Sequence, residues 1–225
     1  ALSHMATNKL GQVKELLALT VLGLLSSLSA SFLLKEASDS FISRESNIII
    51  RAYYDFSHAT HSPLKALAVV LVPSLWLLAL SNHHRKIPRF ELDFFGGYFV
   101  FRMVISLLFV NALLFTPATS QRLLLGQILA FIPFFVVAWG WLIWRLDYWG
   151  RECPQQIIAI PDEKKPITSF DYYHASIYSV INQGKSGFKG VTRLGRSLCL
   201  LHNLMLINLI GLALARAYGL VQKML

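Results

Sequence analysis

The chemistry-bearing residues that stand close together in this sequence form three incomplete patterns. The Asp-x-x-His-x-x-His spacing at residues 55–61 could place three ligands near one helix face, but no fourth ligand for a metal ion is evident. Ser176 and Ser179 have no acid or base partner beyond His174, which argues against nucleophilic catalysis. The Gly-Lys-Ser run at 184–186 lacks the preceding glycine of a phosphate-binding loop. We expect no enzymatic activity, no metal and no cofactor.

A second set of polar residues lies inside long apolar stretches. Its members are Arg102, Asn111, His202, Asn203 and Asn208. Such side chains are costly in a membrane unless they are paired, so each is a candidate for a functional site or for a hydrogen bond between helices. Arg102 could meet Asp93 or Glu91, about two turns earlier, or extend its guanidinium toward the membrane surface. His202 and the asparagines could serve as structural hydrogen bonders or line a water-filled path.

The elements that must position these residues are membrane-spanning helices. Apolar residues make up 55% of the 225, charged residues only 15%, and the mean hydropathy is +0.52, whereas soluble domains carry about a quarter charged residues. Stretches long enough to cross a hydrocarbon core of about 30 Å are present. They are residues 16–34, 66–82, 94–121 (interrupted by Arg102), 123–144 and 197–215. Backbone in lipid must satisfy its own hydrogen bonds, so these stretches are helices.

The residues that flank the spans predict an orientation. Of the basic residues, 13 fall on the side that holds the N-terminus and the region between the fourth and fifth spans, and 7 fall on the other side. The positive-inside rule then favours a cytoplasmic N-terminus. Contacts with anionic lipid heads explain the net charge of +9 without nucleic acid. Tryptophans and tyrosines within residues 139–149 predict an aromatic belt at one membrane boundary.

The segment before the last span, residues 167–182, predicts a short amphipathic helix. Thr168 or Ser169 can cap it, and Asp171 in its first turn is favoured by the helix dipole. At about twelve residues it is too short to cross a membrane. A polar strip containing glycine and the run 191–196 lead from it into the final span. A short helix, a polar strip and a long helix form the order of a re-entrant pore loop, in which non-helical backbone is buried or lines water.

The run Thr192-Arg193-Leu194-Gly195-Arg196 and the segment before it resemble the two-helix pore module of the pore-loop cation channel superfamily, as found in bacterial potassium channels. Those members read as aspartate, a tyrosine-rich pore helix, the filter Thr-Val-Gly-Tyr-Gly and Thr-Pro-Leu-Gly-Arg at the start of the inner helix. Aligning the last motif places the filter, without gaps, on Asn182, Gln183, Gly184, Lys185 and Ser186. The resemblance covers about 50 of the 225 residues and implies a homotetramer that passes monatomic ions.

The filter residues differ from the family pattern in a way that matters for selectivity. A potassium filter stacks backbone carbonyls in place of the ion's hydration shell. Only Gly184 of the two filter glycines is retained, and Lys185 replaces the tyrosine. Lysines facing a shared axis would repel cations. We therefore expect a channel that is not selective for potassium, in which His202, Asn203 and Asn208 line the pore or, like Arg102, are polar groups within the membrane.

Two alternatives stay open. A weaker resemblance links the chain to a family of uncharacterised bacterial five-helix membrane proteins through Val191-Thr192-Arg193 and Leu200-Leu201-His202. The count of basic residues also places the polar strip on the cytoplasmic side, opposite to potassium channels, although ionotropic glutamate receptors have inverted pore loops. The chain could instead be a non-conducting membrane scaffold or assembly factor that keeps the channel fold.

The predicted architecture is all-α, with about five transmembrane helices and a short re-entrant pore helix before the last one. Residues 1–9 form a tail, whose opening Ala1-Leu2-Ser3-His4-Met5 resembles an expression-tag remnant. Residues 10–117 form a peripheral three-helix bundle, and residues 121–225 form the pore-like module. We expect a multi-pass protein of a bacterial inner membrane or an organellar equivalent.

Overall fold

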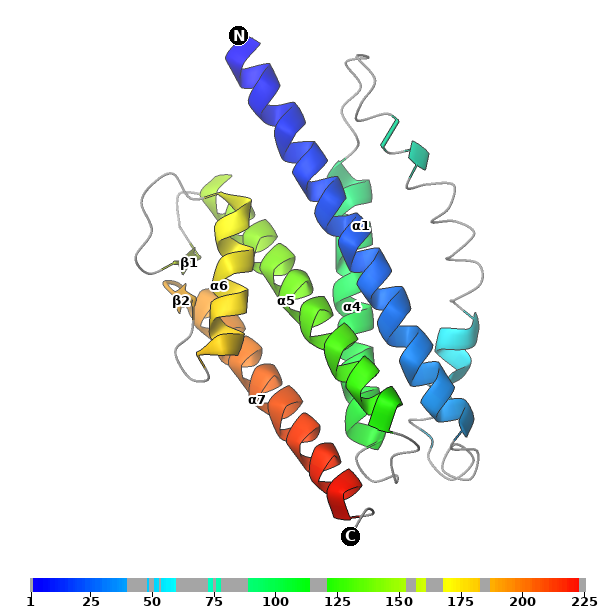
Figure 1. Ribbon diagram of the computed structural model, residues 1–225. Coiled ribbons are helices and arrows are strands. Elements are labelled where there is room, and N and C mark those ends of the chain that lie inside the picture. The colour runs from blue at the N-terminus through cyan, green and yellow to red at the C-terminus, as the bar shows by residue number, and fades with distance from the viewer. Residues whose placement is uncertain are drawn as a thin grey trace. The chain divides into compact units, whose positions relative to one another are not determined.

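The computed structural model shows a helical protein with one short two-stranded ribbon (Figure 1). It describes residues 2–39, 48, 51–52, 54–59, 73–74, 76–77, 89–113, 121–152, 157–160, 168–182 and 187–222. The elements are α1 (Leu2–Asp39), α4 (Arg89–Leu113), α5 (Gln121–Glu152), β1 (Ile158–Ala159), α6 (Ser169–Ile181), β2 (Lys189–Gly190) and α7 (Arg193–Gln222). The chain divides into two compact units, Ala1–Ala112 and Leu113–Leu225.

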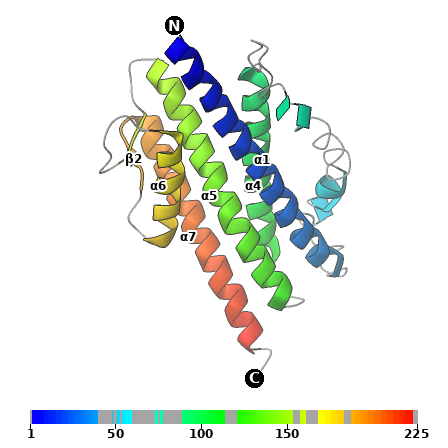
Figure 2. The same ribbon diagram turned by 45° about the horizontal axis from the view of Figure 1, so that its top comes forward.

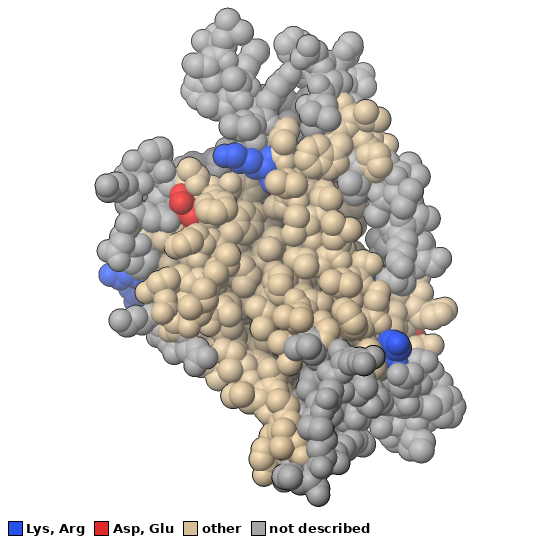
Figure 3. Space-filling view, viewed as in Figure 1, with Lys and Arg blue, Asp and Glu red and all other residues tan. Residues whose placement is uncertain are grey.

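Four of the helices are long and apolar enough to cross a membrane, judged by length and composition. The candidate spans are Val13–Lys35 in α1, Phe90–Ala112 in α4, Gly126–Asp147 in α5 and Arg193–Ala215 in α7. They coincide with four of the five predicted spans, and the described surface in Figure 3 is largely free of charged side chains. The fifth prediction, residues 66–82, lies outside the described residues except for 73–74 and 76–77. The chain is a multi-pass integral membrane protein.

In the first unit, α1 and α4 run in the same direction (Figures 1 and 2). They meet at Gly23, where an added Cβ would lie 3.3 Å from Cζ of Phe99. The hydroxyl of Thr20 on α1 donates to the carbonyl of Leu16 at 2.7 Å and accepts a hydrogen bond from Nε1 of Trp76 at 3.2 Å. The Thr20 hydroxyl is therefore satisfied both by local backbone and by a neighbouring segment.

In the second unit, α6 and α7 both pack on α5. Figures 1 and 2 show α6 beside the C-terminal half of α5, and α7 running opposite to α5. The core of α5 includes the fully buried Phe134, Phe135 and Ile143. Strands β1 and β2 pair antiparallel, with Ile158 opposite Gly190. The architecture is all-α, as predicted, and this two-residue ribbon joins the segment after α5 to the segment before α7.

The aromatic belt predicted for residues 139–149 is wrong for its first members. Trp139 and Trp141 are only 2% and 3% exposed, so they belong to the protein core rather than to a membrane boundary. Trp144 is half-buried. Hydropathy locates the end of a span along the helix but does not fix which way each side chain faces, so the sequence could not separate core tryptophans from interfacial ones.

Candidate functional site

The predicted short helix is α6, which contains 13 residues. Its N-cap is Thr168, and Oδ2 of Asp171 accepts hydrogen bonds from both the backbone N–H and the hydroxyl of Thr168, the latter at 2.8 Å. The predicted helix start is confirmed. A helix of this length rises about 20 Å, which is too short to cross a hydrocarbon core of about 30 Å.

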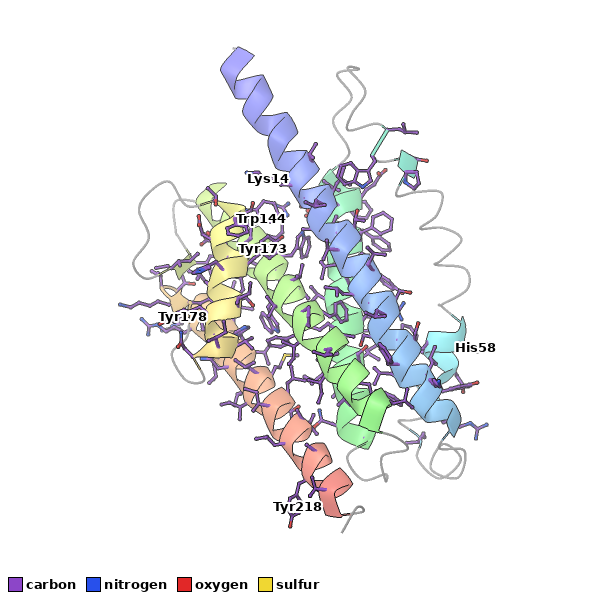
Figure 4. All side chains as sticks on the ribbon, in the orientation of Figure 1. Lys14, His58, Trp144, Tyr173, Tyr178 and Tyr218 are labelled. Carbon is purple, nitrogen blue, oxygen red and sulfur yellow. The ribbon has the colours of Figure 1, made fainter. Side chains whose placement is uncertain are left out.

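α6 approaches α5 closely at Gly140, where an added Cβ would lie 3.1 Å from Cα of Tyr173 and would overlap its ring (Tyr173 is labelled in Figure 4). Gly140 stands seven residues before Asp147, the last residue of the α5 span, so this contact lies about 10 Å below that end. α6 then continues away from that end of α5 (Figures 1 and 2). Its last residue, Ile181, is eight residues beyond Tyr173, so the tip of α6 lies about 20 Å below the end of the span.

The buried side chain that joins α6 to the end of α5 is Asp147, which is 0% exposed. Its Oδ1 accepts hydrogen bonds from the backbone N–H groups of Ile157 at 3.0 Å and Ile158 at 3.1 Å. Its Oδ2 accepts the hydroxyl of Tyr172 on α6. Sequence reasoning missed this residue. Its only signal is a carboxylate three residues after a charge-free run ends, a position that usually indicates a solvated group at a helix end.

The chain returns from α6 to α7 along the backbone of Ile157. The carbonyl of Ile157 accepts hydrogen bonds from the N–H groups of Val191 at 3.0 Å and Thr192 at 3.4 Å. The hydroxyl of Thr192 accepts the N–H of Gly195 at 3.1 Å, which caps the start of α7. A Cβ at Gly195 would overlap the carbonyl oxygen of Ile157. Thr192 and Gly195, two residues of the motif that carried the family resemblance, therefore have local structural roles.

Gly187, where the described chain resumes after α6, packs back onto that helix at Ser179, which is 2% exposed. The Ser179 hydroxyl donates to the carbonyl of Ala175 at 2.9 Å and accepts the N–H of Gly187 at 2.8 Å. A Cβ at Gly187 would lie 2.8 Å from the carbonyl carbon of Ala175, so glycine is required for this close approach. By contrast, the hydroxyl of Ser176, which is 0% exposed, has no hydrogen-bond partner among the described residues.

These two buried serines on one helix give a matched pair of substitutions. Ser179→Ala leaves the Gly187 N–H without its acceptor and is expected to lower the free energy of unfolding by about 1–3 kcal/mol. Ser176→Ala removes a hydroxyl that makes no described hydrogen bond, so it is expected to be neutral or stabilising. Thermal unfolding of the purified protein in detergent measures both. Equal losses in the two variants would show that the Ser179–Gly187 hydrogen bond does not hold the turn.

His202 lies in the core of the second unit at 0% exposure, among aromatic rings from two segments. Its ring centroid is 5.3 Å from those of Phe135 and Trp139 on α5, and 5.5 Å from that of Phe188, which follows the turn after α6. Nδ1 lies 3.3 Å from Oδ1 of Asn203, and Nε2 has no hydrogen-bond partner among the described residues. His202 therefore joins α5, α7 and the return segment within the core of this unit.

The other predicted site residues belong to several segments of the chain. Asn182 is exposed at the C-terminal cap of α6, and residues 183–186 lie outside the described residues. On α7, Asn203 is half-buried and Asn208 is exposed. Arg102 belongs to the first unit, where it is 7% exposed.

The metal-like spacing in residues 55–61 is only partly described. Residues 54–59 are helical, and His58 is exposed with its ring stacked on that of Tyr54, at a centroid distance of 5.9 Å. His61 lies outside the described residues. Within the described part of the chain, no group of three or more His, Cys, Asp or Glu residues is placed to hold a metal ion.

The two faces of α6 differ from those of an amphipathic helix in a soluble protein, because its large apolar side chains are mostly exposed and its small side chains are buried. The buried face carries Tyr172 together with the small residues Ala175, Ser176 and Ser179. The exposed face carries large apolar side chains: Phe170 (71%), Ile177 (44%), Tyr178 (41%) and Ile181 (71%). The predicted amphipathic helix is therefore present, with its large apolar side chains on the exposed face. An exposed apolar face suits lipid or another protein chain, not water.

No protein-family model, curated protein or solved structure matches this chain. The structure itself defines the class as a multi-pass α-helical membrane protein. Within that class, the second unit is distinguished by a short helix that packs along a long one and by a return segment whose backbone is hydrogen-bonded inside the protein.

Proposed function

We propose that this protein is a homotetrameric ion channel of the pore-loop type that is not selective for potassium. In this proposal α6 and the return through β2 form a re-entrant hairpin between α5 and α7. The observation that carries it is the packing of the segment after α6 against the interior of the α7 candidate span. The ring of Phe188 lies 5.5 Å from that of His202, which stands nine residues, or about 13 Å, inside the α7 span.

The hydrogen bonds of this backbone support the hairpin. Non-helical backbone is tolerated at membrane depth only where it is buried in protein or lines water. Here the N–H of Gly187 is satisfied by the Ser179 hydroxyl, and those of Val191 and Thr192 by the carbonyl of Ile157. A helix lying on the membrane surface would not need these internal partners, because water would supply them.

The surface of α7 supports assembly around an axis. Opposite its buried face, exposed residues recur at spacings of three and four: Leu201, Leu204, Asn208, Gly211 and Ala215. Helices in membranes associate through small residues and polar side chains at such spacings. Asn208 suits a contact between helices or a water-lined axis better than it suits lipid. Four copies of α7 around one axis would place this face along the ion path.

The ion preference of the pore depends on the strip 182–186. Asn182 is exposed at the end of α6, so its side chain is available to the path. From the sequence, Lys185 replaces the aromatic residue of a potassium filter, and one of the two glycines is missing. A weakly selective or anion-tolerant pore is the result that we expect from this composition.

The alternative is a non-conducting scaffold or assembly factor with the same fold. The observation that favours it is the burial of His202, a predicted path residue that is 0% exposed and enclosed by Phe135, Trp139 and Phe188. Tight internal packing at this depth is what a fold without a conducting path would also show.

Oligomeric mass tests the assembly on which the pore depends. We expect purified protein in detergent to have four times the 25.4 kDa chain mass. Gly211→Ile adds a side chain where nothing lies within 4 Å, so the chain should fold normally while the close contact between α7 helices is blocked. Gly97→Ile is the matched control, because Gly97 on α4 is equally open. A monomeric or dimeric wild type, or equal behaviour of the two variants, contradicts the proposed tetramer.

A further inference from the structure

Two arginines begin the last candidate span at the membrane boundary of the second unit. Arg193 is the first residue of the α7 span, and Arg196 follows about one turn later. The N–H of Thr192 donates to the carbonyl of Ile157 at 3.4 Å, and the N–H of Ile157 donates to Oδ1 of Asp147 at 3.0 Å. Asp147 is the last residue of the α5 span, so the two spans end close together. This level is where the headgroup region of a bilayer would begin.

The side chains of Arg193 and Arg196 are both exposed, so their guanidinium donors are accessible to a ligand. Residues three apart on a helix are neighbours, with Cβ atoms about 5–6 Å apart, so the two charges lie side by side. Asp147 and Asp171 of the same unit direct their carboxylates to other described partners. Two neighbouring cations on one surface favour an anionic partner from outside the chain.

Beyond the two arginines, the same side of α7 carries large apolar side chains. Leu200 and Ile207 are 61% and 67% exposed, and they follow Arg196 by four and eleven residues. At about 100° per residue, these spacings keep the three side chains within one narrow stripe of the helix. Ile207 lies about 16 Å beyond Arg196 along the helix, which is about half of a hydrocarbon core of about 30 Å. The stripe therefore has the length of an acyl chain in one leaflet.

We propose that this surface binds an anionic phospholipid, with its phosphate on Arg193 and Arg196 and an acyl chain along Leu200 and Ile207. Planar guanidinium groups match the oxygens of a phosphate, and the apolar stripe favours a lipid over free phosphate, which has no chain to bury. The count of basic residues predicts that this boundary faces the cytoplasm, where the leaflet carries anionic lipid. The stripe is centred about a quarter turn from the α7 face proposed for assembly, so the inference does not depend on the pore.

Thermal unfolding of the whole purified protein in micelles of a neutral detergent tests this site. We expect dioleoyl phosphatidylglycerol to raise the Tm in a saturable way, because binding stabilises the folded state, and dioleoyl phosphatidylcholine at the same mole fraction to raise it less. Sodium phosphate at equal ionic strength should not reproduce the rise. Arg193→Gln and Arg196→Gln are each expected to increase the half-saturating phosphatidylglycerol concentration several-fold. Lys35→Gln is the matched control, because Lys35 is exposed at the end of the α1 span and loses the same charge.

The proposal is overturned if phosphatidylcholine or sodium phosphate raises the wild-type Tm as much as phosphatidylglycerol does. It is also overturned if Lys35→Gln weakens the response as much as the two arginine variants. Should the arginine variants fail to fold, native mass spectrometry of retained phosphatidylglycerol compares Ile207→Ser with Leu24→Ser, a change at an equally exposed residue of the α1 span (67% for both). Less lipid on Ile207→Ser supports the site, and equal amounts on the two variants contradict it.

Discussion

Replacing Asp147 with alanine is expected to lower the free energy of unfolding by about 3–5 kcal/mol, the cost of removing the acceptor from several buried donors. Its carboxylate receives the N–H groups of Ile157 and Ile158 and the hydroxyl of Tyr172, and it is 0% exposed. Alanine leaves these donors without a partner at the junction of α5, β1 and α6. β1 and α6 would then lose these hydrogen bonds to the end of α5.

Two milder substitutions are expected to give smaller losses of stability than Asp147→Ala. Asp147→Asn can keep one oxygen as acceptor for the two backbone N–H groups, and Tyr172→Phe removes one hydroxyl from Oδ2. Each is expected to cost about 1–2 kcal/mol. Asp55→Asn, at an exposed carboxylate, is the control and should be neutral. Thermal unfolding in detergent, followed by tryptophan fluorescence, measures the series. If Asp147→Ala unfolds at the same temperature as Asp55→Asn, the carboxylate does not hold the hairpin.

Gly195→Ala is expected to destabilise the second unit by about 3 kcal/mol, the upper range for an added methyl group that meets tightly packed atoms. The new Cβ would overlap the carbonyl oxygen of Ile157. That carbonyl cannot move freely, because it accepts the N–H groups of Val191 and Thr192. The start of α7 would have to separate from the segment that follows α5.

The matched control for this change is Gly211→Ala, on the same helix. Nothing lies within 4 Å of a Cβ at Gly211, so the methyl group meets no clash. It should raise helix stability by up to about 1 kcal/mol, the difference in helix propensity between alanine and glycine. The measurement is again thermal unfolding in detergent. Equal stabilities for the two variants would show that α7 does not pack against the Ile157 carbonyl.

The spans were predictable because lipid imposes a strong and simple requirement. A run of about 20 residues without charge has few alternatives to a spanning helix, and α1, α4, α5 and α7 contain four of the predicted runs. The start of α6 was predictable for a local reason: Thr168 and Asp171 interact across three residues of sequence. Both predictions depend on residues that are near each other in the chain.

The contacts that shape the second unit were not predictable in the same way. The carbonyl of Ile157 accepts hydrogen bonds from the N–H groups of Val191 and Thr192. Every residue has a backbone carbonyl, so the residue type does not indicate this role. The partners of Asp147 lie 10, 11 and 25 residues away. The rotation of α6 depends on Gly140 and Ser179, which allow a close approach on its small face. Such contacts are specified by packing over long sequence separations, which periodicity does not report.

Ion flux from liposomes that contain the purified protein is the most direct test of the proposed pore. We predict that the wild type passes monovalent ions along an imposed gradient, and that Lys185→Glu shifts the preference toward cations because it reverses a charge in the strip 182–186. Lys189→Glu is the control, because Lys189 is exposed in β2, outside that strip. A wild type that conducts no ion under any gradient contradicts the pore and leaves the scaffold. If the two lysine variants shift the ion preference equally, the strip 182–186 does not set the selectivity of the pore.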